Sequence, residues 1–283
     1  MIEIALSLGV IAFALIAIIG ILPLGMAVQR DNREETIINQ DANVLLEAIR
    51  NGEQGLDDLT NYVVAITNYQ TWYPDGQSPK TTTNGYTYAS STASPPFPIT
   101  NGFRIVGLLS TPKYYTPAGP HVGFFSNHVV AVVRALSGAA SEKPPQSNPS
   151  VQEMAFAYRL MAEVVPYGYG TWITRTATNS NAWDQDWTNY TAYLTSQNAY
   201  EWQGRSNYWR YAKNLQADLN DVRLLFRWPA LPRGALGNGR QVFRGITTGP
   251  LQAVIEPGFP IIQPQSLPYT LYFVQPRTFV KAQ

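Results

Sequence analysis

The sequence predicts an α+β fold, in which a long, partly kinked N-terminal helix precedes an antiparallel β-sheet domain with one or two further helices. Three observations predict it: an uncharged apolar run at residues 4–28, a helical spacing of apolar residues directly after it, and later short apolar segments separated by Pro and Gly. We divide the chain into an N-terminal helix, residues 1–52, and a β-rich head domain, residues 53–283.

The apolar run is too long for a cleaved signal peptide, whose apolar part spans about 7–15 residues. As a helix, residues 4–28 would measure about 37 Å, more than the roughly 30 Å hydrocarbon core of a bilayer. The run continues into residues 29–50, where apolar residues recur at helical spacing, and Gly52 is a suitable C-cap. We therefore expect one helix of about 50 residues, whose first half suits lipid or a helical bundle and whose second half packs against the head.

Two features of the apolar half stand out. Gly20, Pro23 and Gly25 lie close together, and because proline removes a backbone hydrogen bond, we expect a kink or an unwound turn there, which an ordinary membrane anchor would also tolerate. Glu3 places a carboxylate at the mouth of an apolar helix, which is costly in lipid unless it stays at the interface or meets a cation. Glu3 then either lies among headgroups, favoured by the helix macrodipole, or pairs with a neighbouring chain, whose free α-amino group is the obvious candidate.

The stretch Met1-Ile2-Glu3-Ile4-Ala5-Leu6, followed by an apolar helix, resembles the N-terminus of type IV pilins and type II secretion pseudopilins. The resemblance implies that a prepilin peptidase removes a short basic leader, that the new N-terminus is methylated, and that Glu3 neutralises the terminal amine of the adjoining subunit. The family's helix-breaking region corresponds to Gly20–Pro23. The resemblance further implies a homo-oligomeric helical filament at the cell surface, built by pilus or secretion machinery from subunits first inserted in the inner membrane.

The chain departs from the family at its start. The family places two more residues ahead of its glutamate than the Met1 and Ile2 present here. The resemblance therefore implies either two further residues and a leader before Met1, or different processing. A basic leader would also account for Arg30 and Arg33, which follow the apolar run against the positive-inside rule for an outward-facing head. Residues 214–229 and 239–244 are similar to large pilin-like proteins of the Verrucomicrobia.

Charge and cysteine content narrow the function classes. The formal charge is +1, from 20 basic and 19 acidic residues scattered along the chain, so we expect no basic face and no nucleic-acid partner. Charged residues make up 14% of the chain, a sparsely charged surface that suits an exported protein. Cysteine is absent, which excludes disulfides and thiolate metal sites.

The remaining elements follow from local patterns. Residues 56–68 show a helical spacing, and residues 72–100 read as an exposed loop with a hairpin near residues 86–88. Residues 103–109 and 122–136 predict paired strands, and the capping-box sequence Ser150-Val151-Gln152-Glu153 predicts a helix to about residue 165 after a linker at 142–149. Further strands are expected at residues 222–228, 241–247, 251–256 and 269–275, with Gly237-Asn238-Gly239 as a turn.

One segment, residues 167–211, is rich in aromatic side chains. It holds five of the seven tryptophans: Trp172, Trp183, Trp187, Trp202 and Trp209. We favour the interpretation that they fill a satellite core or a contact between subunits, and the alternative is that they stack on sugar rings or anchor a partner. Within the same segment Asp184 and Asp186 are calcium candidates in an oxygen-rich stretch without EF-hand spacing, and the alternative there is a polar loop.

No catalytic set is visible. The two histidines, His121 and His128, have no metal-ligand partners in sequence, and the serine-hydrolase, phosphate-loop and dinucleotide-binding motifs are missing. We therefore expect no enzyme and no cofactor. The leading hypothesis is a structural subunit of an extracellular filament. The alternatives are a pseudopilin of a type II secretion system, or a single-pass membrane-anchored protein that binds carbohydrate.

Overall fold

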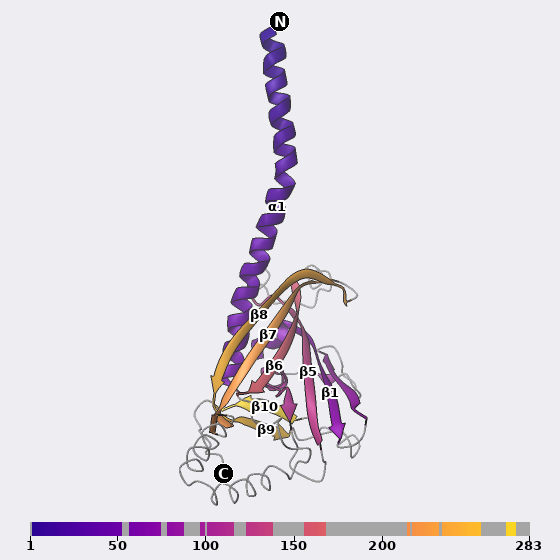
Figure 1. Ribbon diagram of the computed structural model, residues 1–283. Coiled ribbons are helices and arrows are strands. Elements are labelled where there is room, and N and C mark those ends of the chain that lie inside the picture. Colours follow the sequence, from indigo (N-terminus) through magenta and orange to yellow (C-terminus); the bar gives the residue numbers. More distant parts are fainter. Residues whose placement is uncertain are drawn as a thin grey trace, which may run out of the picture.

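The computed structural model confirms the α+β fold: a 50-residue helix followed by a largely antiparallel sheet and a short second helix (Figure 1). It describes residues 2–52, 57–74, 78–87, 97–99, 101–115, 123–137, 156–167, 214–215, 217–231, 234–255 and 270–275. The predicted linker at 142–149 lies outside the described residues.

Helix α1 (Ile2–Asn51) has two halves with different surroundings. Residues 2–36 project from the head over about 52 Å, and their described side chains are exposed except for the half-buried Glu34. From Ile37 onward buried residues recur every three to four positions, which places one stripe of the helix against the sheet. The helix ends at Gly52, whose φ of 66° is left-handed and whose missing Cβ would lie 2.6 Å from the carbonyl oxygen of Val274. The predicted helix and its C-cap are therefore confirmed.

Pro23 lies inside α1 without interrupting it. Figure 1 shows the axis of α1 changing direction gently about halfway along the helix, within its projecting half. The unwound turn expected near Gly20–Gly25 is not seen, because the helix is continuous on both sides of Pro23.

The main sheet has the strand order β3-β2-β1-β5-β6-β7-β8, with β4 paired to β5. All these pairings are antiparallel except the short parallel pair of β2 and β3. The strands are β1 (Val63–Pro74), β2 (Lys80–Thr87), β3 (Phe97–Pro98), β4 (Tyr114–Tyr115), β5 (Gly123–Arg134), β6 (Ala157–Pro166), β7 (Leu219–Ala230) and β8 (Leu236–Thr248). A separate hairpin-like pair consists of β9 (Leu251–Ile255) and β10 (Thr270–Val274).

The core lies between the inner face of the sheet and the helices. Along β6 and β7 buried and partly exposed residues alternate, so each strand turns one face to the core. Phe226 sits between the rings of Tyr158 and Phe243, with centroids 5.1 and 5.3 Å away. Helix α2 (Gly102–Leu109) closes the core from the other side, where Phe103 lies 4.3 Å from Phe273.

The predicted helix at residues 56–68 is wrong, and so is the predicted loop at 72–100 where residues 72–74 and 80–87 form strands. Residues 75–77, 88–96 and 100 of that loop lie outside the described residues. The 3-10 helix η1 (Asp57–Asn61) ends early, and β1 begins at Val63. β1 then pairs with β5 on one side and β2 on the other, over most of its length. The apolar and β-branched residues at 63–68 fit the spacing of a helix as well as that of a strand. Pairing with β2 and β5, which are distant in sequence, selects the strand.

The predicted strand at residues 103–109 is a helix. Asn101 caps α2 by accepting a 2.9 Å hydrogen bond from the amide of Arg104. Ile105, Val106, Leu108 and Leu109 then share one buried face, as a helix requires. The strand predicted at 122–136 is confirmed as β5, but its partners are β1, β4 and β6.

The helix predicted at residues 150–165 is wrong from residue 157 onward, because residues 157–166 form β6. The capping-box residues 150–153 lie outside the described residues. The strands expected at 222–228, 241–247, 251–256 and 269–275 are confirmed as β7, β8, β9 and β10. The predicted turn Gly237-Asn238-Gly239 instead lies within β8. Gly239 is needed there because a Cβ would lie 2.4 Å from the ring of Trp228 on β7.

Candidate assembly site

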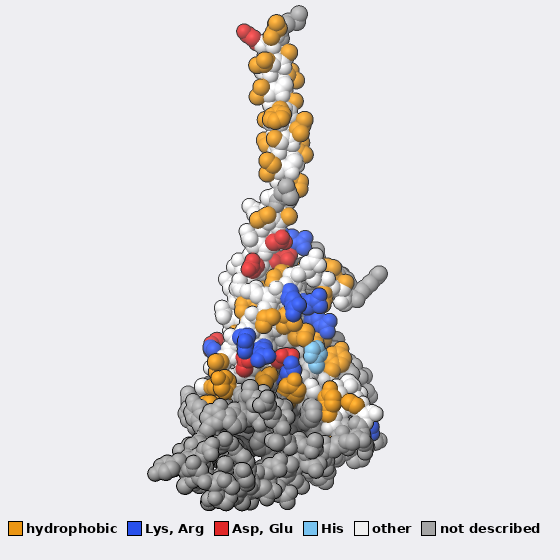
Figure 2. Space-filling model, viewed as in Figure 1, with side chains coloured by type: hydrophobic (Ala, Val, Ile, Leu, Met, Phe, Trp, Pro, Cys, Tyr) orange, Lys and Arg blue, Asp and Glu red, His pale blue; other side chains and the backbone are white. Residues whose placement is uncertain are grey.

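The projecting half of α1 is an apolar surface without cover in the structure. Figure 2 shows hydrophobic side chains along its whole length, with charged side chains where the helix meets the head. Among the described residues α1 is the one helix long and apolar enough to cross a membrane. On the described part of this projecting half, fifteen large apolar side chains are more than half exposed: Ile2, Ile4, Leu6, Leu8, Val10, Ile11, Phe13, Leu15, Ile16, Ile18, Ile19, Ile21, Leu22, Met26 and Val28.

Such a surface is far larger than soluble monomers expose. Burying one side chain of this size contributes about 1.5–3 kcal/mol, and contiguous apolar patches on monomers seldom exceed a few hundred Å². The projecting half of α1 is therefore more stable in contact with lipid or with other apolar helices than in contact with water. It can also contact lipid first and other helices afterwards.

Polar groups are few on the projecting half. Glu3 lies in the first turn and is the only charged residue between positions 2 and 29. Ser7, one turn further on, donates a 2.9 Å hydrogen bond from its hydroxyl to the carbonyl of Ile4. Ser7 is thus satisfied within the helix, whereas the Glu3 carboxylate needs a group from outside the helix if it is removed from water.

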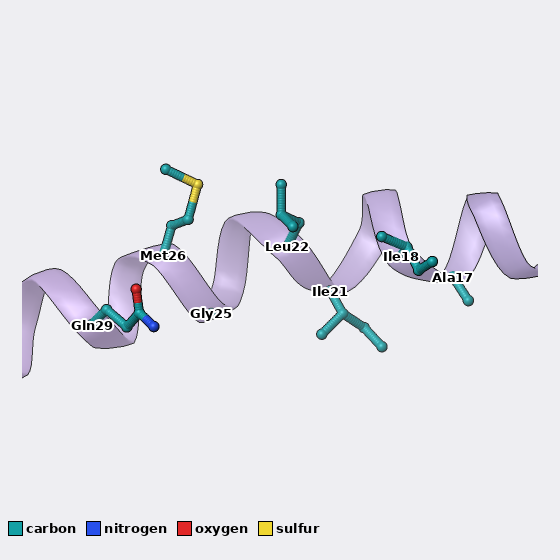
Figure 3. Close-up of a pocket in the computed structure, with 7 residues that line it drawn as sticks. All are labelled: Ala17, Ile18, Ile21, Leu22, Gly25, Met26 and Gln29. Atoms are coloured by element: carbon teal, nitrogen blue, oxygen red, sulfur yellow. The ribbon is translucent and has the colours of Figure 1, made fainter.

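Gly25 opens a shallow recess on α1 beside the predicted helix break. Its lining comes from successive turns: Ala17, Ile18, Ile21, Leu22, Gly25, Met26 and Gln29. Figure 3 shows Leu22 and Met26 on one side of the helix and Ile21 on the other, with Gly25 between them. No atom lies within 4 Å of a Cβ built on Gly20 or Gly25, so both positions are open in the single chain.

A buried polar contact ties α1 to the sheet. Asp41 is fully buried, and its carboxylate accepts hydrogen bonds from the hydroxyl of Ser137 at 2.6 Å and from the amide of Leu136 at 2.9 Å. Burial raises the pKa of Asp41, although these hydrogen bonds oppose the effect. The buried hydroxyl of Tyr158 faces the same carboxylate without a hydrogen bond of good geometry, and burial followed by the charge of Asp41 raises its pKa well above the usual value.

The outer face of the sheet carries a charge pattern that sequence reasoning missed. Arg227 on β7 lies directly opposite Arg159 on β6 and Arg240 on β8. We call these three residues the arginine row. The expectation of no basic face is wrong, because strand register collects arginines that are scattered along the sequence. The signal in sequence was only that arginines alternate with apolar residues in these strands.

A second row of charges on the same face is paired. Arg223 lies opposite Arg244, and both donate to the Asp221 carboxylate at 2.7–2.8 Å. Partial burial acts to raise the pKa of Asp221, but the two guanidinium groups outweigh it and lower that pKa. On β6, Glu163 accepts a 2.8 Å hydrogen bond from Lys113.

Several predicted site residues fall outside the described residues: Trp172, Trp183, Trp187, Trp202, Trp209, Asp184, Asp186 and His121. His128 lies on β5 opposite Tyr69, with the ring centroids 6.1 Å apart. Within the described ranges no three metal-ligating side chains gather to hold an ion. Glu3, Gly20 and Pro23 all lie on the projecting half of α1.

Comparisons with protein-family models, with curated proteins and with solved structures found no match to this chain.

Proposed function

We propose that this chain is a structural subunit of an extracellular filament of the type IV pilus kind, assembled through the projecting half of α1. The observation that carries the proposal is the division of one continuous helix. Residues 2–28 present an exposed apolar surface, and a stripe of residues from Ile37 onward forms part of the core of the head. An element built in this way can move between lipid and a helical bundle without refolding the head.

In the proposed assembly, α1 occupies two environments in succession, first the membrane and then a helical bundle. The helix first crosses the inner membrane, with the head outside. Subunits then leave the lipid and pack their helices together, so that the heads cover the bundle at the cell surface. In the bundle Glu3 pairs with the N-terminal amine of a neighbouring subunit. An unpaired carboxylate in an apolar bundle would cost several kcal/mol, which fixes the axial register of neighbouring helices. Partners in this scheme are other copies, a prepilin peptidase and the assembly machinery.

The test is Glu3→Ala, with Glu3→Gln to remove charge while preserving size and Ser7→Ala as the control one turn away. We expect both Glu3 variants to insert in the membrane as wild type does and to form few or no filaments. Ser7→Ala should assemble normally, since its hydroxyl bonds only within the helix. The readouts are the membrane-bound fraction and electron microscopy of sheared cell-surface material. Normal filaments from Glu3→Ala would remove the charge-pairing role.

The same experiment separates the alternatives. A pseudopilin would give short assemblies that depend on Glu3 and no long surface filaments. A membrane-anchored carbohydrate-binding protein would remain monomeric in detergent and would be indifferent to both Glu3 variants.

A further inference from the structure

The arginine row is unfavourable in a single copy of this chain. Neighbouring strands lie about 4.8 Å apart, and like charges directly opposite one another destabilise a sheet. Arg227 and Arg240 are exposed, Arg159 is half-exposed, and none of the three forms an ion pair with another described residue. The second row differs in this respect, since the Asp221 carboxylate lies between Arg223 and Arg244 and forms an ion pair with each. The arginine row therefore lacks an anion that a partner can supply.

Between the two charged rows lies a row of aliphatic side chains. Leu225 on β7 is opposite Met161 on β6 and Val242 on β8, and Val242 is 51% exposed. A flat surface that mixes arginine with Met, Leu and Val has the composition of a protein–protein interface. Nucleic acids and acidic polysaccharides need the charges but not the aliphatic row.

The head is charged asymmetrically. The outer face of the sheet carries six arginines against two carboxylates, a formal charge of +4: Arg134, Arg159, Arg223, Arg227, Arg240 and Arg244 against Glu163 and Asp221. From Arg30 onward, the helices and η1 carry six surface carboxylates against four arginines, a formal charge of −2: Asp31, Glu34, Glu35, Glu47, Asp57 and Asp58 against Arg30, Arg33, Arg50 and Arg104. Figure 2 shows mostly basic side chains over the sheet, and acidic together with basic ones where α1 leaves the head. Two copies therefore complement one another.

On the projecting half of α1, the exposed acids next to the head are Asp31 and Glu35, which we call the acidic collar. The arginine row lies near the level of Asn39 on α1, because Gln241, next to Arg240, donates a 3.2 Å hydrogen bond to Asn39. The collar of the same chain is thus about 10 Å further toward the N-terminus. A second copy shifted by this distance along parallel helices brings its collar level with the arginine row.

We infer that the arginine row of one copy binds the acidic collar of a second copy, as a lateral contact between subunits. Because two different surfaces meet, the contact is heterologous and repeats from copy to copy, as an open helical array requires. The inference rests on the proposed function, to which it adds the residues that join the heads. Lipid headgroups fit less well, since the row lies about 16 Å beyond Val28 along α1 and the headgroup layer is only about 5–8 Å thick.

The experiment uses charge reversal in two full-length variants that carry different tags. One variant has an acidic sheet face, Arg227→Glu with Arg240→Glu, and the other has a basic collar, Asp31→Lys with Glu35→Lys. Each alone should self-associate in detergent about tenfold or more weakly than wild type, because like charges then meet. Mixed together, the two should co-assemble as well as wild type, since every contact between unlike copies is again complementary. If the substitutions acted only by breaking contacts within one chain, mixing the two variants would not restore association.

Three controls make the result decisive. Lys80→Glu changes charge on β2, away from the row, and should not weaken association. Arg227→Gln with Arg240→Gln removes the like-charge contact, so it should fold at least as well as wild type and still associate weakly. Repeating the mixing in the Glu3→Ala background tests the head contact without N-terminal pairing, so failure of the two proposals can be distinguished.

The inference is wrong if wild type stays monomeric, if either reversed variant associates like wild type, or if mixing restores nothing. It is also wrong if the arginine variants lose binding to duplex DNA or polygalacturonate while their self-association is unchanged. That last result would assign the arginine row to a polyanion.

Discussion

The carboxylate of Asp41 on α1 accepts a 2.6 Å hydrogen bond from the hydroxyl of Ser137, just beyond the end of β5. The amide of Leu136 donates to the other oxygen of the same carboxylate at 2.9 Å. Asp41 is fully buried, so the helix is joined to the sheet by a polar contact inside an apolar core. The contact places a titratable group at the base of the projecting helix.

Asp41→Asn should change how stability depends on pH. Burial raises the pKa of Asp41 in the folded chain, so the fold favours the protonated form. The contribution of this group is then present below its ordinary pKa of about 4 and is lost as pH rises through the raised folded value. The free energy of unfolding of wild type should therefore fall relative to Asp41→Asn as pH rises above about 4, until the raised pKa of the folded chain has been passed.

The measurement is urea unfolding of the full chain in detergent at a series of pH values. Asp31→Asn is the control, because Asp31 is an exposed carboxyl on the same helix. Parallel stability profiles for wild type and Asp41→Asn would show that the fold does not perturb this carboxyl.

Leu45→Ala should loosen the packed half of α1. Leu45 is fully buried in the core, and truncating such a side chain costs about 2–5 kcal/mol of unfolding free energy. Its neighbour Val44 is 43% exposed, so Val44→Ala should change stability by about 0.5 kcal/mol or less. Denaturant midpoints of the two variants give the comparison, and similar losses would contradict the assigned orientation of the helix.

Asp221→Asn should weaken the sheet at neutral pH by about 1 kcal/mol, a figure kept low because the two arginines are largely exposed. The substitution removes the anion that separates Arg223 from the opposite Arg244. The pKa of Asp221 is lowered, so its stabilisation is present above about pH 4 and is lost as pH falls through the lower folded value. Wild type and variant should converge in acid and in high salt, and a difference that persists in both would point to lost packing instead.

Gly107→Ala should strain the contact between α2 and β10. A Cβ on Gly107 would lie 2.7 Å from the ring of Phe273 and 2.8 Å from Cβ of Leu271. Overpacking of this kind costs about 1–3 kcal/mol. Gly9→Ala is the matched control, because no atom lies within 4 Å of its Cβ. Equal thermal stability of wild type and Gly107→Ala would mean that β10 moves aside without cost.

Sequence reasoning succeeded where the signal is local. The 50-residue helix follows from an uncharged run joined to a helical spacing, and Gly52 ends it because the next turn needs a left-handed residue. Strands β7 to β10 were found because turns and alternation mark them. The segments at 63–68, 103–109 and 157–165 were assigned wrongly, since short apolar stretches fit either period until a distant strand or core face selects one.

The arginine row was beyond the reach of the sequence for a different reason. Arg159, Arg227 and Arg240 become neighbours only through the registers of β6 with β7 and of β7 with β8. A shift of one residue in either pairing would turn the arginine of the shifted strand toward the core, so that the three arginines would no longer be neighbours on the outer face. The buried carboxylate of Asp41 is equally invisible in the sequence, because an acidic residue within an amphipathic helical segment ordinarily lies on the solvent face.

The continuity of α1 has a mechanical consequence. A pull on the projecting half along its axis meets no hinge at Pro23, so tension passes through the backbone directly into the core of the head. There it loads the hydrogen bonds from Leu136 and Ser137 to Asp41, and the apolar stripe of α1, in shear against the sheet. Pulling α1 out of the head would therefore require these hydrogen bonds and apolar contacts to break together, which makes the junction between the helix and the head resistant to tension.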